Sequence, residues 1–437
     1  MLPTRRLKLA VVLIALALAV LAGAAQQVRP ILVLVSFDGW RWDYIARANA
    51  PNLRALASRG VRSRGLIPSF PARTFPNHYT IVTGLYPEHH GIISNNIAEP
   101  GFPDRFSMTA DTARDARWWG GEPLWVTAIR QGQRADAMFW PGSEAPIGGV
   151  RPTDWKPFDG AMPNADRVQQ VLDWLALPPD RQPSLVTLYF NEVDGAGHSY
   201  GPDSAQVLEA AHHLDDALGQ LVSGVQALGL TDRTSFVVVS DHGMSQHADS
   251  HTIFLDDYVD LSTVDVIDWT PILELAPRSG SPGSIDEVYR ALKGTHRALT
   301  IYKREEMPAR LHYRDNPRIP PIIGLADDGW MITSHKRLAD AREKGTKTGG
   351  EHGYDPKYRS MHGLFVAAGP RIARHKIVPE FQNIHIYDFL CEILGLTPAS
   401  NDGDPGVTRT FFTNARDRAR FARTAPRVLG ALAVSPR

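Results

Sequence analysis

Five short apolar runs recur along the chain and alternate with segments of helical periodicity. The runs cover residues 31–36, 135–140, 185–190, 235–240 and 364–368. Such nearly continuous runs are typical of strands buried on both faces of a parallel sheet. Helical patterns cover residues 51–58, 123–131, 165–175, 204–228 and 385–394, several of them with glycine or proline near an end. The alternation predicts an α/β fold with a doubly wound, mostly parallel sheet and helices on both faces.

The rhythm changes between residues 253 and 344. Stretches at 264–275, 285–292, 299–302 and 330–334 predict β, α, β and β elements in that order. We therefore expect a smaller α+β subdomain, residues 253–344, inserted into a catalytic domain made of residues 26–252 and 345–404. The arginine-rich residues 405–437 are expected to form a peripheral tail.

The first 25 residues have the pattern of a secretory signal peptide. A basic start is followed by an apolar run at residues 9–21 and by the small residues Ala22, Gly23 and Ala24. An uncleaved membrane anchor is the alternative, but the apolar run is short for a full span. We expect cleavage, a periplasmic or secreted protein, and no membrane association beyond this segment.

Charge and cysteine content exclude several classes of protein. Lysine plus arginine equals aspartate plus glutamate, at 47 each among 437 residues. Without a net field no stable nucleic-acid partner is implied, and an anionic substrate must be held by local charge. The single cysteine, Cys391, excludes an internal disulfide framework. These features leave the oligomeric state open.

Aspartate and histidine cluster at the ends of the predicted strands and just after the predicted insertion. Ligands collect at strand ends in open α/β sheets, and aspartate with histidine but no thiolate suits zinc in a hydrolytic site. A capping aspartate beside a surface histidine is commoner for any single pair, but it would have to occur independently at several strand ends. The set is large enough for two ions. One could be held by Asp38, Asp241 and His242, and the other by Asp194, His198 and His352.

A candidate nucleophile lies between the first two clusters. Thr74 precedes a predicted helix that extends to Thr83, so its hydroxyl would sit at a helix N-terminus, where a phosphate is also favoured. A hydroxyl is a weak nucleophile unless a base or a metal favours its alkoxide. Spacing alone leaves the choice between Thr74 and Ser69 open. We expect the neighbouring Arg73 to face solvent.

Two long motifs carry a resemblance to a known family. The sequences RTFPNHY at 73–79 and TGLYPEHHGIISN at 83–95 closely resemble the nucleotide pyrophosphatase/phosphodiesterase family of the alkaline phosphatase superfamily. The similarity continues through residues 121–125, 139–143, 194–202, 240–244 and 352–354, and covers about residues 30–404. It implies an alkaline-phosphatase-like fold. The cysteine-rich and nuclease-like modules of animal relatives have no counterpart in the sequence, so we expect a bacterial, single-domain type.

The resemblance also implies roles for individual residues. Thr74 becomes the nucleophile and a ligand of the zinc ion held by Asp38, Asp241 and His242, while Asp194, His198 and His352 hold the second, giving two Zn²⁺ per chain. Asn95 matches the asparagine that, with the amide of Thr74, binds a nonbridging phosphate oxygen. From composition alone Asn95 would be a turn residue.

Three aromatic residues complete the implied site. Phe75 and Phe158 match the pair that stacks on a nucleobase in this family, and Trp140 is expected in the same wall. Core packing is the alternative for both phenylalanines. It is stronger for Phe158, because the register around that residue is less certain and the family often has tyrosine there.

The resemblance implies a zinc-dependent phosphodiesterase or nucleotide pyrophosphatase. Cleavage of a nucleotide pyrophosphate or phosphodiester bond would release a nucleoside 5′-monophosphate through a phosphothreonine intermediate. Two other hypotheses stay open. One is a lipid or choline phosphodiesterase of the same fold, and the other is a catalytically silent periplasmic protein that binds nucleotides or zinc.

Overall fold

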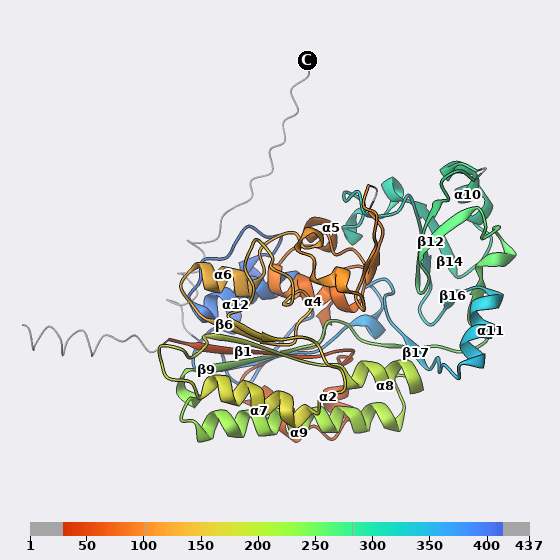
Figure 1. Ribbon diagram of the computed structural model, residues 1–437. Helices are drawn as coiled ribbons and strands as arrows, with labels where there is room; N and C mark the ends of the chain where they lie inside the picture. The colour runs from red at the N-terminus through yellow and green to blue at the C-terminus, as the bar shows by residue number, and fades with distance from the viewer. Residues whose placement is uncertain (1–28, 100, 282, 414–437) are drawn as a thin grey trace, which may run out of the picture.

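A central sheet of eight strands organises the computed structural model, which describes residues 29–99, 101–281 and 283–413 (Figure 1). The strand order is β19-β2-β18-β9-β1-β8-β6-β7. The central strands run parallel to one another, and β18 alone is antiparallel to both of its neighbours. The prediction of a mostly parallel α/β sheet is therefore confirmed. The strands in sheet order are β19 (Lys376–Val378), β2 (Val61–Ser63), β18 (Phe365–Ala368), β9 (Thr234–Val239), β1 (Ile31–Phe37), β8 (Leu185–Phe190), β6 (Ala135–Met138) and β7 (Asp154–Lys156).

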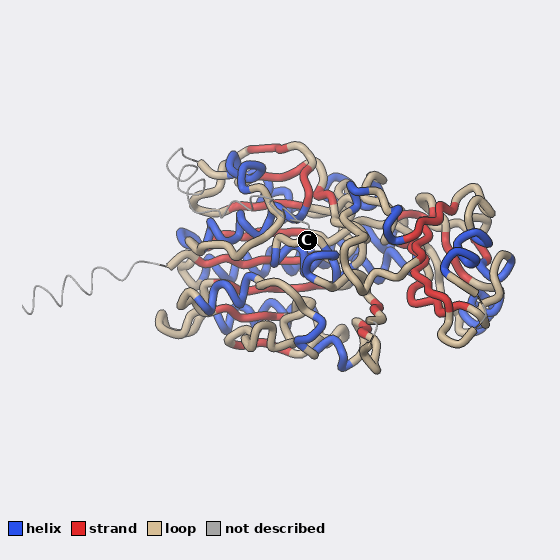
Figure 2. Tube along the Cα trace, turned by 90° about the horizontal axis from the view of Figure 1, so that it is seen from above, coloured by secondary structure: helices blue, strands red, loops and turns tan. Residues whose placement is uncertain are grey.

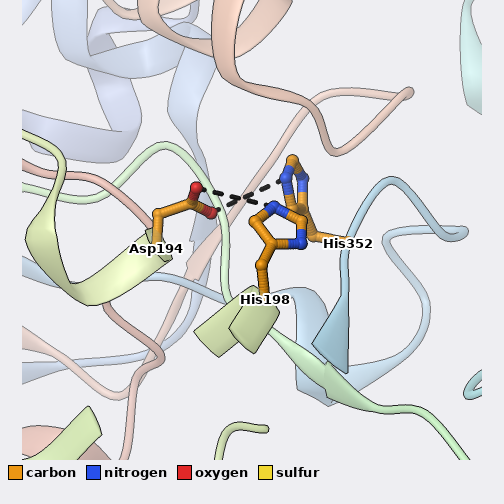
Figure 3. Close-up of side chains that lie close together, drawn as sticks. All are labelled: Asp194, His198 and His352. Carbon is orange, nitrogen blue, oxygen red and sulfur yellow. Dashed lines mark ion pairs between the residues drawn. The ribbon is translucent and has the colours of Figure 1, made fainter. Parts of the chain in front are cut away.

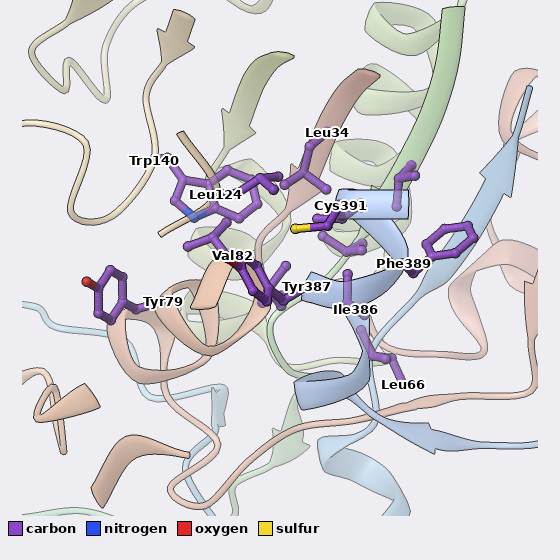
Figure 4. Close-up of a cluster of buried hydrophobic side chains, with 14 of the residues drawn as sticks. Leu34, Leu66, Tyr79, Val82, Leu124, Trp140, Ile386, Tyr387, Phe389 and Cys391 are labelled. Carbon is purple, nitrogen blue, oxygen red and sulfur yellow. The ribbon is translucent and has the colours of Figure 1, made fainter. Parts of the chain in front are cut away.

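Helices cover both faces of this sheet, which explains why its central strands β1, β8 and β9 are buried along their whole length. Alternate residues of β1 enter two different cores: Leu32 and Leu34 face one side, and Val33 and Val35 the other. The first face carries α4 (Thr74–Thr83), α6 (Leu124–Arg130) and α12 (Ile386–Leu394), and the second carries α3 (Pro51–Ser58), α7 (Asn164–Leu175) and α9 (Ala205–Ala227) (Figure 1). Cys391 lies buried in the first core, close to Leu34 and Tyr387 (Figure 4).

The segment between residues 253 and 344 forms a second, smaller sheet beside the first (Figure 2). Its order is β12-β13-β15-β14, all antiparallel, with α10 (Ile285–Leu292) packed on it. The single strand predicted for residues 264–275 is wrong, because the chain turns there to make β12 (Val264–Asp268) and β13 (Ile272–Pro277). Two further elements were not predicted, β15 (Ile322–Ala326) and α11 (His335–Glu343). The division into separate folding units stays a prediction.

Gly324 explains why the sequence pattern did not predict β15. A Cβ at this position would lie 2.9 Å from the side chain of Ile301 in the neighbouring β14 (Leu299–Lys303). A larger side chain would crowd Ile301 and Leu273, whereas glycine leaves room for both. A glycine in a short apolar run weakens the strand pattern, so the sequence does not reveal this strand.

The chain beyond residue 404 does not begin as a peripheral tail. After α13 (Pro405–Thr408) the chain runs into the main core, where Phe411 and Phe412 are each 2% exposed. The ring of Phe411 packs against Phe365, Phe381 and Phe389. Residues 405–413 thus pack on the main sheet. The remaining tail and the predicted signal peptide lie outside the described residues.

No helix among the described residues is both long and apolar enough to cross a membrane.

Replacing Phe411 by alanine should destabilise the fold strongly. The change leaves a cavity among three aromatic rings, and such truncations typically cost about 3–5 kcal/mol. Urea unfolding followed by circular dichroism measures the loss. The matched control is Ile377→Ala, because Ile377 is 56% exposed and should cost no more than about 1 kcal/mol. Equal losses for the two variants would mean that residues 405–413 are not part of the core.

Candidate metal centre

The predicted ligands come together because three parallel strands end at the same edge of the sheet. Asp38 directly follows β1, and Asp241 and His242 follow its neighbour β9. On the other side of β1, strand β8 leads into α8 (Glu192–Tyr200), which carries Asp194 and His198. His352 directly follows β17 (Gly350–Glu351), where the chain returns from the smaller sheet.

Gly39 makes the first strand end compatible with this convergence. Its φ of +69° lies in the left-handed region, which side chains rarely adopt. A Cβ at this position would also come within 2.8 Å of the Cα of Asp194. Glycine is therefore required twice, once for the turn after β1 and once for the approach of α8.

Asp194, His198 and His352 form one compact group of possible ligands (Figure 3). Asp194 and His198 are four residues apart on α8, so they share a helix face. The Nε2 atoms of His198 and His352 lie 3.5 and 3.6 Å from the carboxylate of Asp194. The Nδ1 atoms of the same rings contact backbone carbonyls, of Gly350 at 3.1 Å and of Ala72 at 2.9 Å. Because a carbonyl only accepts, these contacts place the proton on Nδ1 and leave Nε2 free for a metal.

The other predicted ligands lie directly beside this group. His242 Nε2 is 2.9 Å from Asp241 and 3.5 Å from Asp38, and its ring stacks on that of His352 with 3.6 Å between centroids. Possible ligand atoms also converge in two groupings that the sequence did not suggest: Asp38 with Asp194 and His242, and Asp38 with His78 and Asp241. The first grouping joins Asp38 and His242, assigned to one ion, with Asp194, assigned to the other, so the two predicted ion positions are neighbours. The division of ligands between two ions stays a prediction.

Charge within this centre is poorly compensated by the protein alone. Burial, then repulsion from Asp241 and Asp194, raises the pKa of Asp38 well above its usual value. Burial also opposes the charged form of Asp241, but His242 and His78 outweigh it and lower that pKa. Within the described residues, Asp38 Oδ1, Asp194 Oδ1 and Asp241 Oδ2 are buried without a hydrogen-bond partner. Such oxygens are costly unless a cation binds them, and three carboxylates with histidine nitrogens fit zinc.

His78 is a residue of this centre that sequence analysis missed. One ring nitrogen lies 2.7 Å from Ser36 Oγ and the other lies 2.8 Å from the carbonyl oxygen of Thr74. Both nitrogens are thus engaged by the protein, so His78 joins β1 to α4 instead of serving as a free ligand. The available signal was its spacing, four residues after Thr74 on one helix. Tyr189 was missed as well; its hydroxyl donates to Asp38 Oδ2 at 2.6 Å.

Thr74 begins α4 and lies next to the metal-binding residues. Its Oγ1 is 3.4 Å from His242 Nε2. Ser69, the other hydroxyl considered, donates to Asn383 Oδ1 at 2.9 Å, so its hydroxyl is directed away. The amide of Phe75 donates to Asn95 Oδ1 at 3.0 Å. Because an asparagine side chain accepts only through that oxygen, this bond leaves Asn95 Nδ2 as a free donor at the start of α4.

The expected exposure of Arg73 is wrong. Arg73 is 8% exposed, and its guanidinium contacts Asp268 at 3.2 Å and the carbonyl oxygen of Thr270 at 2.7 Å. Both partners belong to the segment around β12 and β13. Long-range packing, which the local sequence does not reveal, draws this side chain inward.

A cavity of about 470 Å³ opens beside Thr74, Asp38 and Asp194. Phe75, Trp140 and Phe158 all line it, so the three predicted aromatic residues share one wall. They differ in their packing. Phe75 contacts Phe106 and Trp119, and Trp140 is 3% exposed and donates to the carbonyl oxygen of His78, whereas Phe158 is 50% exposed. Phe158 is therefore the aromatic residue most open to a ligand.

Fold and site together define an α/β protein that can hold metal ions beside a hydroxyl group at a helix start. The sequence profile of the Type I phosphodiesterase / nucleotide pyrophosphatase family matches residues 32–355. The chain belongs to this family of hydrolases, which confirms the predicted family and fold. The bacterial, single-domain type stays a prediction.

Individual relatives give the same assignment. Venom phosphodiesterase CdcPDE of Crotalus durissus collilineatus is 37% identical over 395 residues, covering 88% of this chain and 46% of its own. Ectonucleotide pyrophosphatase/phosphodiesterase family member 3 of Rattus norvegicus is 34% identical, with 86% and 43% covered. The chain spans about half the length of these curated relatives. Murine ectonucleotide pyrophosphatase / phosphodiesterase 5, solved as an inactive variant with AMP, superposes with a TM-score of 0.82 at 34% identity, covering 88% of this chain and all of that one.

Removing His198 should reduce the metal content by one ion. We expect about two zinc ions per chain in the zinc-loaded protein and about one in His198→Ala, since the variant loses one of three grouped ligands. Inductively coupled plasma mass spectrometry after gel filtration gives the ratio. The control is His212→Ala, because His212 is similarly exposed and contacts only a carbonyl and Asp216 on the surface. Unchanged zinc in His198→Ala would contradict the assignment.

Proposed function

We propose that this protein is a zinc-dependent phosphodiesterase and nucleotide pyrophosphatase. It cleaves nucleotide pyrophosphate or phosphodiester bonds and releases a nucleoside 5′-monophosphate through a phosphothreonine intermediate. One observation carries the proposal: the hydroxyl of Thr74 lies at the open start of α4, 3.4 Å from His242 and beside three carboxylates that each have one buried oxygen without a hydrogen-bond partner. A protein that only stores zinc or binds nucleotides does not need such a hydroxyl.

Each residue has a defined task in this reaction. Thr74 Oγ1 attacks the phosphorus atom, the bond to the leaving oxygen breaks, and the alcohol or phosphate product departs. A water molecule then cleaves the phosphothreonine and frees the nucleoside monophosphate. Asn95 Nδ2, oriented by the bond from Phe75 to Oδ1, donates to a nonbridging oxygen as charge develops. Bound zinc would supply the positive charge that favours the threonine alkoxide and offsets the charge of the phosphoryl group.

The cavity supports a nucleotide as the group that is recognised. Phe75 and Phe158 line it beside Thr74, and aromatic rings stack on any base with little discrimination. The AMP complex of the murine relative points to the same class of ligand. A choline phosphodiesterase would need free carboxylates to hold a quaternary amine. Asp111 and Glu144 do line the cavity, but both pair with Arg114.

We also place the protein in the periplasm or outside the cell. The signal-peptide pattern of residues 1–25 is the basis of this proposal. Names such as venom phosphodiesterase and ectonucleotide pyrophosphatase among the relatives agree with it.

Replacing Thr74 by alanine should abolish turnover. Loss of the nucleophile should lower kcat by roughly a thousandfold or more, while Thr74→Ser keeps part of the activity. Release of p-nitrophenol from p-nitrophenyl thymidine 5′-monophosphate measures the rate, and metal analysis checks that zinc is still bound. Ser69→Ala is the matched control and should retain most of the activity. If Ser69→Ala abolished turnover while Thr74→Ala retained it, Ser69 would be the nucleophile instead.

Phe158→Ala should weaken substrates that contain a base. Base stacking is worth about 1–3 kcal/mol, so kcat/KM for p-nitrophenyl thymidine 5′-monophosphate should fall by about one to two orders of magnitude. Methyl p-nitrophenyl phosphate, which has no base, should change much less. Tyr200→Ala serves as a control, since Tyr200 is 45% exposed and is not among the residues that line the cavity. Equal losses for both substrates would argue against a base-binding wall.

A further inference from the structure

A single carboxylate of the smaller sheet reaches the two segments that carry Thr74 and Asn95. Asp268, the last residue of β12, accepts a hydrogen bond from Ser94 Oγ at 2.9 Å and lies 3.2 Å from the guanidinium of Arg73. Both contacts use Oδ2, while Oδ1 accepts from the amide of Trp269 at 2.9 Å. Asp268 therefore holds the residue before Thr74 and the residue before Asn95 with one oxygen atom.

Arg73 depends on Asp268 for compensation of its charge. Among the described residues Asp268 is its only ion-pair partner, and Arg73 Nε has no partner. Glu274 is nearby, but burial, followed by repulsion from Asp268, raises the pKa of Glu274 to about 8. At neutral pH Glu274 is thus mostly uncharged, and its carboxyl group is already bonded to the hydroxyl of Tyr313. Glu351 also acts on Arg73 from a longer range, but the largest attraction and the direct ion pair come from Asp268.

These contacts close a ring around the two reacting groups. One side of the ring runs from Asp268 through Arg73 to Thr74 and Phe75. The amide of Phe75 then bonds Asn95, and Ser94 leads back to Asp268. Thr74 and Asn95 are thereby linked twice, once through the amide of Phe75 and once through Asp268. All members except Phe75 are at most 8% exposed. A buried ring of this kind fixes a distance that either segment alone would leave adjustable.

We propose that Asp268 is a positioning residue, which sets the separation between the Thr74 hydroxyl and the Asn95 amide through Arg73 and Ser94. This inference rests on the proposed function, in which those two groups act on the same phosphorus centre. An error of about 1 Å between reacting groups can cost roughly a hundredfold in rate. A residue that only anchored the smaller sheet would affect stability and leave the rate of each folded molecule unchanged.

Asp268→Asn is the central variant, because it keeps the shape and the acceptor for Trp269 but replaces the oxygen that Ser94 and Arg73 share. With p-nitrophenyl thymidine 5′-monophosphate, kcat should fall by about 10- to 100-fold while KM stays within about threefold. Zinc content should not change. The control is Asp215→Asn, which removes a buried carboxylate that bonds the backbone amides of Asn52 and Leu53 far from the site. It should lose stability without losing kcat.

A second measurement separates positioning from general loosening. In the Rp and Sp isomers of the phosphorothioate analogue of this substrate, sulfur replaces one or the other nonbridging oxygen, so the ratio of their kcat/KM values depends on where Asn95 donates. Asp268→Asn should change this ratio by at least about threefold, and Asp215→Asn should not change it. If Asp268→Asn folds poorly, Ser94→Ala breaks one arm of the ring alone. It should shift the ratio in the same direction, with a smaller loss of kcat.

The outcomes distinguish this inference from the proposed function. If the unmodified, zinc-loaded protein cleaves the substrate and both Asp268→Asn and Ser94→Ala keep its kcat and its isomer ratio, the inference is overturned and the function stands. If the unmodified protein cleaves no phosphodiester and no nucleotide pyrophosphate, the proposed function and this inference are both overturned. A drop in kcat with a shifted ratio in Asp268→Asn, absent in Asp215→Asn, supports the positioning role.

Discussion

Three carboxylates that meet at one edge of the sheet, each with a buried and unpaired oxygen, are the constraint around which this molecule is built. Asp38, Asp194 and Asp241 meet where β1, β8 and β9 end, and each has an oxygen that no described residue satisfies. Burying like charges costs several kcal/mol each unless an opposite charge binds them. The protein satisfies the other oxygens of two of them, with the hydroxyl of Tyr189 on Asp38 and the amide of Gly39 on Asp241. These unpaired oxygens are available to metal ions, and metal binding would then be coupled to the stability of this edge.

Thr74, the proposed nucleophile, is held in relation to these carboxylates by the sheet itself. Ser36 of β1 bonds one nitrogen of His78, and the other nitrogen contacts the carbonyl oxygen of Thr74. Burial lowers the pKa of His78, which keeps the ring neutral and suited to bridge a hydroxyl and a carbonyl. Because Asp38 lies only two residues after Ser36, one strand fixes both a predicted metal ligand and the start of α4. The spacing between Asp38 and the hydroxyl of Thr74 is therefore set by packing within the main core.

Sequence patterns predict this site better than they predict what supports it. Local patterns and long motifs predict the strands, the six Asp and His residues and the three aromatic residues. The structure brings these Asp, His and aromatic side chains together at one edge of the sheet. Arg73, Asp268 and His78 could not be predicted in the same way, because their roles depend on partners far away in the sequence. A buried arginine has the same local signature as an exposed one. Likewise, the arginine-rich composition of residues 405–437 does not reveal that Phe411 and Phe412 are buried, because their burial depends on the shape of the core.

The two sheets contribute different parts of the site. The large sheet brings together the groups that can bind metal, since its parallel strands deliver Asp38, Asp194 and Asp241 to one edge. The smaller sheet contributes none of the six predicted Asp and His ligands. Through Asp268 and the carbonyl oxygen of Thr270, however, it holds Arg73, the residue that precedes Thr74. The carboxylates predicted to bind metal are placed by the ends of strands in the large sheet, whereas the segments of Thr74 and Asn95 are also linked through the smaller sheet. The separation of Thr74 and Asn95 therefore depends on packing between the two sheets as well as on the main core.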